Sequence, residues 1–435
     1  MPDILAPGSD RVRRLSKEGA WIILGQASAV LGSLAGVRLL TELLNPAAYG
    51  ELALGMTVAA VVTQTVIGPL GNGVARFYAP AQERGDLGAY LDAVRRLVSA
   101  ATVIIVLMIL LSIAGLLVVG RTQWIGIATA ALVFATVSGY NAILNGIQNA
   151  ARQRSIVALH QGIESWARFL VAAGLLLWLG ATSTVAMVGY VIAVVLVLGS
   201  QYVFFRKTVP HNGTTANKDR NWQERIWKYS WPFGAWGIFA WAQQASDRWA
   251  LEIFTTTQEV GLYVVLFQLG YYPMSMVTGM TMQFLGPILF QRAGDASDSR
   301  RNENVSKVVR RLTGLTLALT GVIFLAALLF HAQIFRLLVA KEYADVSYLL
   351  PWMLLAGGIF AAGQTIALNL MSQMKTHTMV IVKIATSSLG MILNFAGAYF
   401  LGIKGIVLAT IFFSVLYFAC LAATSTRTAI DPGIQ

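Results

Sequence analysis

The sequence predicts an all-α integral membrane protein with 12 transmembrane helices, arranged as two parallel six-helix lobes around a central cleft. Three observations lead to this fold class: the composition, a succession of apolar stretches, and an internal repeat. Of the 435 residues, 56% are hydrophobic and 12% are charged, whereas soluble domains carry about a quarter charged residues. A soluble fold of this length cannot bury so much apolar surface, so the chain is predicted to lie in a bilayer.

The individual helices follow from the apolar stretches. A helix needs about 20 mostly apolar residues to cross the hydrocarbon layer. Such stretches run over residues 21–44, 52–73, 97–119, 123–146, 156–179, 184–205, 231–254, 260–288, 312–332, 346–370, 379–401 and 404–425. The eighth contains Pro273 and Pro287 and is predicted to be kinked or broken there, because proline removes a backbone hydrogen bond.

The basic residues predict the orientation of these helices. Of the 32 lysines and arginines, 24 fall in the termini and alternate loops on one side, and 4 fall in loops on the other. Positive charge accumulates on the cytoplasmic side of membrane proteins. Both termini are therefore predicted to be cytoplasmic. The net charge of +12 is explained by topology and indicates no nucleic-acid partner.

The chain repeats one six-helix pattern at an offset of about 210 to 223 residues. A tryptophan, an arginine and a glutamate recur at identical spacings, as Trp21, Arg38 and Glu42 and then as Trp231, Arg248 and Glu252. Further correspondences follow in the same order: Gly50 with Gly261, Gly68-Pro69 with Gly286-Pro287, Arg95-Arg96 with Arg310-Arg311, Asn145 with Asn369, and Gly180 with Gly402.

Because each repeat has an even number of helices, the two repeats are predicted to be parallel. This predicts an N-terminal lobe at 1–205, a cytoplasmic linker with an interfacial helix at 206–230, and a C-terminal lobe at 231–435.

The residue inventory excludes several classes of site. The single cysteine, Cys420, precludes a thiolate metal site, and the four histidines show no ligand-like spacing. No Gly-Lys dipeptide is present, so the chain has no nucleotide-binding P-loop. The longest outer connection, at 333–345, is too short to house a catalytic site. We therefore expect no metal, no cofactor and no enzymatic activity.

Several segments resemble a known family. They are LLTELLNPAAYGELAL, GPLGNGVARFY, ASDRWALEIFTTTQEVGLY, LLVAKEYADVSYLLPWM and LGIKGIVLATI. Together they are similar to the Wzx-like polysaccharide or O-antigen flippases, within the multidrug/oligosaccharidyl-lipid/polysaccharide exporter superfamily.

The resemblance covers about residues 15–425 and implies a MATE-like fold. It implies transport of an undecaprenyl-diphosphate-linked oligosaccharide from the cytoplasmic to the periplasmic leaflet, for O-antigen, capsule or exopolysaccharide synthesis. It also implies a polysaccharide polymerase and a chain-length regulator as partners. A monomer suffices for transport.

Charged residues inside the predicted helices are the candidates for function, since a charge at the bilayer centre costs about 2.5–3.5 kcal/mol. Four of the five candidate cations lie within the predicted helices, namely Arg38, Arg168, Arg248 and Lys383. The fifth, Arg76, marks the cytoplasmic end of the second predicted helix. If these cations face one cleft, they form a relay of binding groups for a lipid diphosphate, which is the substrate that the family resemblance implies. The amides Asn145 and Asn369 are candidates for contacting the glycan, with Gln148, Gln373 and Asn394 beside them, although such residues also join transmembrane helices.

The acidic residues have two possible roles. Glu42, Glu164, Asp247 and Glu252 either neutralise nearby arginines and fix helix packing, or couple transport to an ion gradient. Three acid–base pairs have the i,i+4 spacing that places both side chains on one helix face. Asp247 is a candidate coupling residue because it has no cation four residues away on its own helix, although Arg248 adjoins it. Glu164 is favoured slightly, because it is predicted to be buried and able to take up a proton.

Two other functions compete with the flippase. An ion-coupled multidrug exporter of the same superfamily would need a cleft dominated by acids, whereas this chain has four bases and four acids within its predicted helices. A non-transporting scaffold for polysaccharide assembly would need no charges inside the bundle.

Overall fold

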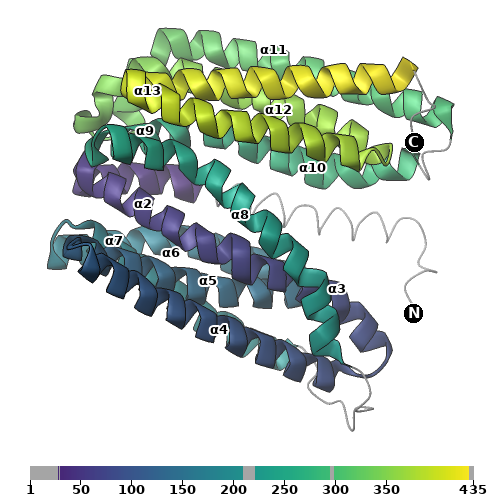
Figure 1. The fold of residues 1–435 in the computed structure, drawn as a ribbon, viewed down its shortest axis with the longest axis horizontal. Helices are drawn as coiled ribbons and strands as arrows, with labels where there is room; N and C mark the ends of the chain where they lie inside the picture. The colour runs from purple at the N-terminus through teal and green to yellow at the C-terminus, as the bar shows by residue number, and fades with distance from the viewer. Residues whose placement is uncertain (1–27, 29, 209–220, 294–297, 431–435) are drawn as a thin grey trace. The chain divides into compact units, whose positions relative to one another are not determined.

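In the computed structural model every regular element of the described residues is a helix (Figure 1). The structure describes residues 28, 30–208, 221–293 and 298–430. The first helix is described over residues 30–43. The others are α2 (Pro46–Val62), η1 (Thr63–Ile67), α3 (Gly68–Glu83), α4 (Leu87–Val118), η2 (Thr122–Trp124), α5 (Ile125–Ala150), α6 (Arg154–Leu179), α7 (Ser183–Thr208), α8 (Trp222–Phe254), α9 (Thr257–Leu266), η3 (Phe267–Tyr271), α10 (Tyr272–Ala293), α11 (Ser299–Leu338), η4 (Lys341–Leu349), α12 (Leu350–Ser372) and α13 (Thr376–Ile430).

Twelve helical spans can be counted in the described residues, as predicted. The second span is continuous through α2, η1 and α3, and the eighth through α9, η3 and α10. The eleventh and twelfth are the two parts of α13, which divide at Gly402, where φ is 56°. Eight of the described helical segments are long and apolar enough to cross a membrane, with α13 counted once. The fold is therefore that of an all-α, multi-pass membrane protein.

The chain forms two compact units that exchange short segments. The first unit takes in the chain up to Leu44 and Glu51–Ala242, and the second takes in Asn45–Gly50 and the chain from Gln243 onward. Of the predicted linker, residues 206–208 are the end of α7, and residues 222–230 are the start of α8, which continues unbroken to Phe254. Residues 209–220 lie outside the described residues. The predicted lobe boundaries remain predictions.

Local sequence explains why α8 begins at Trp222. The Asn221 side-chain oxygen accepts a hydrogen bond from the backbone N–H of Glu224 at 3.1 Å, and its amide donates to the Glu224 carboxylate at 3.0 Å. The first bond satisfies a backbone donor that the first turn of a helix otherwise leaves free, and the second holds the Asn221 side chain in place. Farther along, the Trp241 indole N–H donates to the Thr57 carbonyl at 2.8 Å, which attaches this half of α8 to α2 in the first unit.

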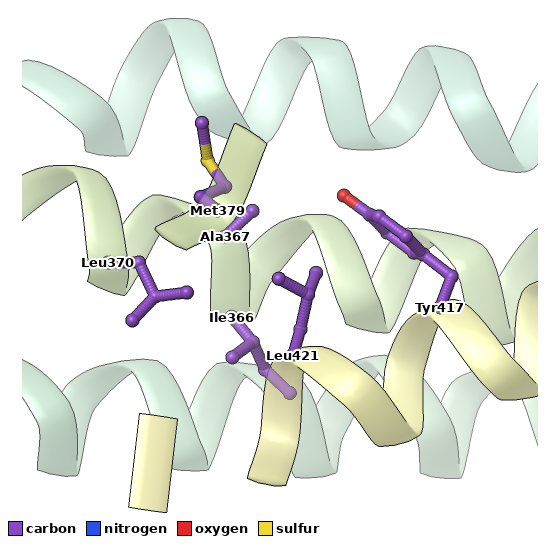
Figure 2. Close-up of a cluster of buried hydrophobic side chains, with 6 residues drawn as sticks. All are labelled: Ile366, Ala367, Leu370, Met379, Tyr417 and Leu421. Atoms are coloured by element: carbon purple, nitrogen blue, oxygen red, sulfur yellow. The ribbon is translucent and has the colours of Figure 1, made fainter. Parts of the chain in front are cut away.

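One core cluster of the second unit lies between α12 and α13. Ile366, Ala367 and Leu370 of α12 pack against Met379, Tyr417 and Leu421 of α13 (Figure 2). All six side chains are less than a tenth exposed. Residues from both parts of α13 therefore hold α12, which fixes the two halves of this long element on either side of Gly402.

Within the second unit, the backbones at the start of α2 and the start of α9 cross in close contact at Gly50 and Gly261. We call this contact the glycine crossing. A Cβ atom on Gly50 would collide with the Thr257 carbonyl, and one on Gly261 with the Pro46 carbonyl. Next to this crossing, the Tyr49 hydroxyl donates to the Gln268 side chain at 2.9 Å. These two glycines are the pair that the sequence repeat aligned, and the crossing leaves no room for a Cβ atom at either position.

Each repeat contains a π-helix directly before a proline. η1 precedes Pro69 and η3 precedes Pro273. Proline has no N–H to donate to the carbonyl four residues earlier, and a π-helix rearranges the hydrogen bonds over that stretch. The irregularity expected in the eighth span therefore lies at η3, whereas Pro287 lies inside α10. The structural counterpart of Pro69 is thus Pro273.

The two repeats also share their turns. α6 is followed by Gly180 with φ of 108°, matching the position of Gly402. Arg152 after α5 and Met374 after α12 both have positive φ, of 61° and 60°. Few non-glycine residues adopt this conformation. The recurrence of both turns supports the duplication predicted from sequence.

Candidate functional site

Arg168 of α6 is a partly buried cation held by aromatic rings in the first unit. Its guanidinium carbon lies 5.8 Å from the ring centroid of Phe169 and 5.9 Å from that of Tyr190 on α7. Its Nε is buried and makes no hydrogen bond within the described structure. Among the described residues no carboxylate forms an ion pair with Arg168. This guanidinium is positioned by cation–π contacts and keeps hydrogen-bonding capacity for an anion.

Two further polar groups surround this arginine. Glu164 lies one turn earlier on α6, within electrostatic range of Arg168, and Asn141 of α5 lies beside its carboxylate. Asn141 is 1% exposed, and neither atom of its amide makes a hydrogen bond of regular geometry in the described structure. Buried amides normally have partners. The first unit thus contains a polar cluster, formed by Asn141, Glu164 and Arg168, with unused hydrogen-bonding groups.

Arg248 of α8 has a different environment in the second unit. Its Nη1 donates to Asp247 Oδ1 at 3.2 Å and to the Gln244 carbonyl at 2.8 Å. Its guanidinium carbon lies 4.9 Å from the ring centroid of Phe267 in η3. The other carboxylate oxygen of Asp247 accepts a hydrogen bond from the Tyr263 hydroxyl at 2.7 Å. Arg248 is therefore neutralised by its own neighbour.

This cluster ties α8 to other helices of the second unit. Asp247 reaches α9 through Tyr263. The preceding residue, Ser246, accepts a hydrogen bond from the Asn394 amide of α13 at 2.9 Å. Asp247 is 7% exposed, and a buried ion pair needs additional hydrogen bonds to offset the loss of solvation. Tyr263 and Gln244 supply them, so the cluster is structurally complete.

The remaining predicted charges are placed separately. Arg38 and Glu42 form an i,i+4 ion pair with about half-exposed side chains, which fits the packing interpretation. Arg76 is exposed on α3, Lys383 is partly buried on α13, and Glu252 is partly buried on α8. Of the predicted charges, the structure brings Asp247 to Arg248, Glu42 to Arg38, and Glu164 near Arg168. Arg38, Arg76 and Arg168 belong to the first unit and Arg248 and Lys383 to the second, so the relay remains a prediction.

The predicted amides form equivalent networks in the two repeats. In the first unit, the Gln201 amide of α7 donates to Asn145 at 2.6 Å and to Gln148 at 2.9 Å. In the second, Asn369 accepts from Ser306 of α11 and donates to Ser425 of α13, each at 3.3 Å. Both asparagines therefore join neighbouring helices, which favours a packing role for them.

Sequence reasoning missed the aromatic and hydroxyl partners of the charges. Tyr190, Tyr263 and Phe267 lie on other helices than the charges they contact. No spacing along one helix connects them to Arg168, Asp247 or Arg248. Within the described residues, no group of three or more histidine, cysteine, aspartate or glutamate side chains is placed to hold a metal ion.

Comparisons with known proteins agree with the fold. A sequence model of a family described as "Polysaccharide biosynthesis protein" matches residues 15–293, which is more than half of the chain. No curated protein matches the sequence.

Solved structures share the fold at low sequence identity. An inward-facing multidrug resistance MATE family transporter of the MOP superfamily superposes with a TM-score of 0.69 and 13% identity, covering 93% of this chain and 94% of that chain. The lipid II flippase MurJ, in an inward closed conformation, gives 0.68 and 14%, covering 94% and 87%. A MATE transporter of Vibrio cholerae gives 0.62 and 15%, covering 97% of each chain.

Proposed function

Because the chain belongs to the polysaccharide biosynthesis protein family, we propose that it is a flippase for an undecaprenyl-diphosphate-linked oligosaccharide. It moves this lipid from the cytoplasmic to the periplasmic leaflet of the bacterial inner membrane by alternating access. The fold is that of MOP superfamily transporters. The substrate, the direction and the cytoplasmic location of both termini belong to the proposal.

The environment of Arg168 is the observation that carries this proposal. A guanidinium inside a transmembrane helix with a buried, unsatisfied Nε and no carboxylate in contact among the described residues is costly unless it has a function. A diphosphate supplies oxygens that guanidinium groups bind bidentately. Arg168 is thus the first residue that we assign to phosphate binding.

The other proposed residues are assigned roles according to the partners that they already have. Lys383 and Arg76 would contact the diphosphate on other parts of its path, since no described carboxylate forms an ion pair with either. Arg38 and Arg248 already have carboxylate partners, so the substrate has to replace Glu42 or Asp247 to use them. Glu164 remains the preferred coupling residue, because Asp247 is bonded to both Tyr263 and Arg248.

A complementation experiment tests the role of Arg168. Wild type, Arg168→Ala and Arg168→Lys are expressed at equal membrane levels in a host lacking its own flippase, with Arg121→Ala as the control for loss of an exposed arginine. Surface polysaccharide and accumulated lipid-linked intermediate are measured. We expect at least about a tenfold loss for alanine, since charged hydrogen bonds contribute about 1.5–3 kcal/mol, with partial recovery for lysine and wild-type behaviour for Arg121→Ala.

Two outcomes would change the assignment. Full activity of Arg168→Ala would remove Arg168 from substrate binding and leave it a packing role. Failure of the wild type to complement several hosts, together with drug resistance on overexpression, would replace the flippase with a multidrug exporter. Polymerase and chain-length partners are proposed from the family alone.

A further inference from the structure

Trp222, the first residue of α8, is a buried ring with two arginines over it. It is 1% exposed and lies in edge contact with Phe77 of α3 at 6.3 Å and with Tyr90 of α4 at 6.1 Å between ring centroids. The guanidinium carbon of Arg84, which ends α3, lies 5.9 Å from the Trp222 ring centroid, and that of Arg225 lies 5.6 Å from it. Two cations from separate helices are thus held at one place.

Both arginines are available to an external anion. Their side chains are exposed, and within the described chain no carboxylate forms an ion pair with either. The adjacent acid, Glu224, is bonded instead to Lys228 at 2.5 Å and to Asn221 at 3.0 Å. Lys228 holds the pKa of Glu224 below its usual value, so this carboxylate stays charged and committed to Lys228.

An apolar surface continues from the two arginines along α8. Phe77 contacts Tyr229 at 5.8 Å, and Tyr229 contacts Phe233 at 5.4 Å between ring centroids. Tyr229 and Phe233, one turn apart on this face of α8, are 37% and 40% exposed. Aromatic side chains of this kind lie at the level of lipid headgroups and upper acyl chains. The site therefore combines two fixed cations with an adjacent surface suited to hydrocarbon.

We propose that Arg84 and Arg225, positioned on Trp222, bind the phosphate headgroup of an anionic phospholipid whose acyl chain lies along the aromatic surface of α8. An exposed guanidinium beside an indole still presents its planar fork, which matches phosphate oxygens. Basic pockets at the ends of transmembrane helices recognise such headgroups. The bound lipid would connect the end of α3 to the start of α8. This site shares no residue with the Arg168 cluster and does not depend on the flippase assignment.

Lipid retention by the purified full-length protein tests the proposal. Native mass spectrometry would measure binding of phosphatidylglycerol and cardiolipin against phosphatidylcholine. The variants are Arg84→Ala/Arg225→Ala, the corresponding double lysine variant, and Trp222→Phe. The control is Arg300→Ala/Arg310→Ala, which removes two exposed charges from α11.

We expect the wild type to prefer the anionic lipids and the double alanine variant to bind them roughly 10- to 30-fold more weakly, since each basic residue contributes about 1 kcal/mol near a lipid surface. The double lysine variant should be intermediate, because it keeps the charge and loses the planar fork. The control should bind like the wild type, and Trp222→Phe should retain most of the binding if its thermal stability is unchanged.

Three results would overturn the proposal. One is equal affinity of the wild type for anionic and neutral lipids. Another is an equal loss of anionic-lipid binding in the α11 control, which would indicate that binding depends on net positive charge and not on a specific site. The third is one-for-one displacement of phosphatidylglycerol by a polyprenyl diphosphate, which would assign these arginines to the transported lipid.

Discussion

At the scale of single residues, charges in this protein are distinguished by their partners. Arg168 and Arg248 have the same side chain within transmembrane helices, yet one has a buried unsatisfied Nε and the other is bonded to Asp247 and Gln244. A charge that is fully paired stabilises one arrangement of helices. A charge that is stacked on aromatic rings and otherwise unpaired is suited to bind a passing anion.

Tyr263 should contribute to stability through its hydrogen bond with Asp247. Tyr263→Phe removes the hydroxyl that donates to the buried carboxylate at 2.7 Å, and an unsatisfied buried group costs about 1–3 kcal/mol. We expect a lower melting temperature for the variant in detergent. Tyr202→Phe, at a half-exposed position on α7, is the matched control and should melt like the wild type. Equal melting of both variants would contradict this role of Tyr263.

The sequence predicted which charged residues to examine, and it could not predict which of them pair. The i,i+4 rule anticipated the contact between Arg38 and Glu42, which the structure contains. The same rule paired Glu164 with Arg168, which form no ion pair in the structure. It left Asp247 without a cation, although the adjacent Arg248 contacts it. Side-chain direction and partners on other helices decide these contacts, and neither is encoded in spacing along one helix.

At the scale of elements, the glycine crossing between α2 and α9 should be intolerant of side chains. Gly50→Ala places a Cβ against the backbone carbonyl of Thr257, and overpacking of this kind costs about 1–3 kcal/mol. We expect a lower melting temperature. Gly115→Ala in α4 is the matched control, because a Cβ there meets nothing within 4 Å, and alanine favours a helix interior by about 1 kcal/mol. A Gly50→Ala variant as stable as the wild type would show that the crossing can separate at no cost.

Element boundaries were harder to predict than the elements themselves. The apolar stretches located the spans, but α3 continues to Glu83 and α8 begins at Trp222, well outside the apolar windows. Polar and aromatic residues there remain helical because capping at Asn221 and packing of Trp222 stabilise them. The π-helices could not be predicted from periodicity, since only the later prolines indicate them.

At the scale of the whole molecule, the twelve spans counted in the described residues predict that both termini lie on the same side. With the positive-inside orientation, a fluorescent protein fused after Gln435 should fluoresce. Alkaline phosphatase should be active when fused at Gly120, in the turn after α4, and inactive when fused at Gly85, in the turn after α3. Active phosphatase at Gly85 would reverse the proposed topology. An inactive fusion at Gly120, with equal expression, would count against the number of spans that precede it.

Fold class was the most predictable property of this chain. Composition and hydropathy predicted a membrane bundle, and the repeated glycines predicted positions that the structure uses twice, at Gly180 and Gly402 and at Gly50 and Gly261. The internal repeat predicted two lobes, but it did not predict that Asn45–Gly50 belongs to the second unit. This assignment follows from packing, in which Asn45–Gly50 and Gln243 onward form one unit.

The exchange of segments between units has a consequence for synthesis of the protein. The ribosome makes Asn45–Gly50 early, yet the unit that contains this segment continues from Gln243. The first unit, in turn, is incomplete until α8 has been made as far as Ala242. We therefore expect neither unit to finish folding when the sixth helix leaves the translocon, and the first half to stay unfinished in the membrane until the seventh helix arrives.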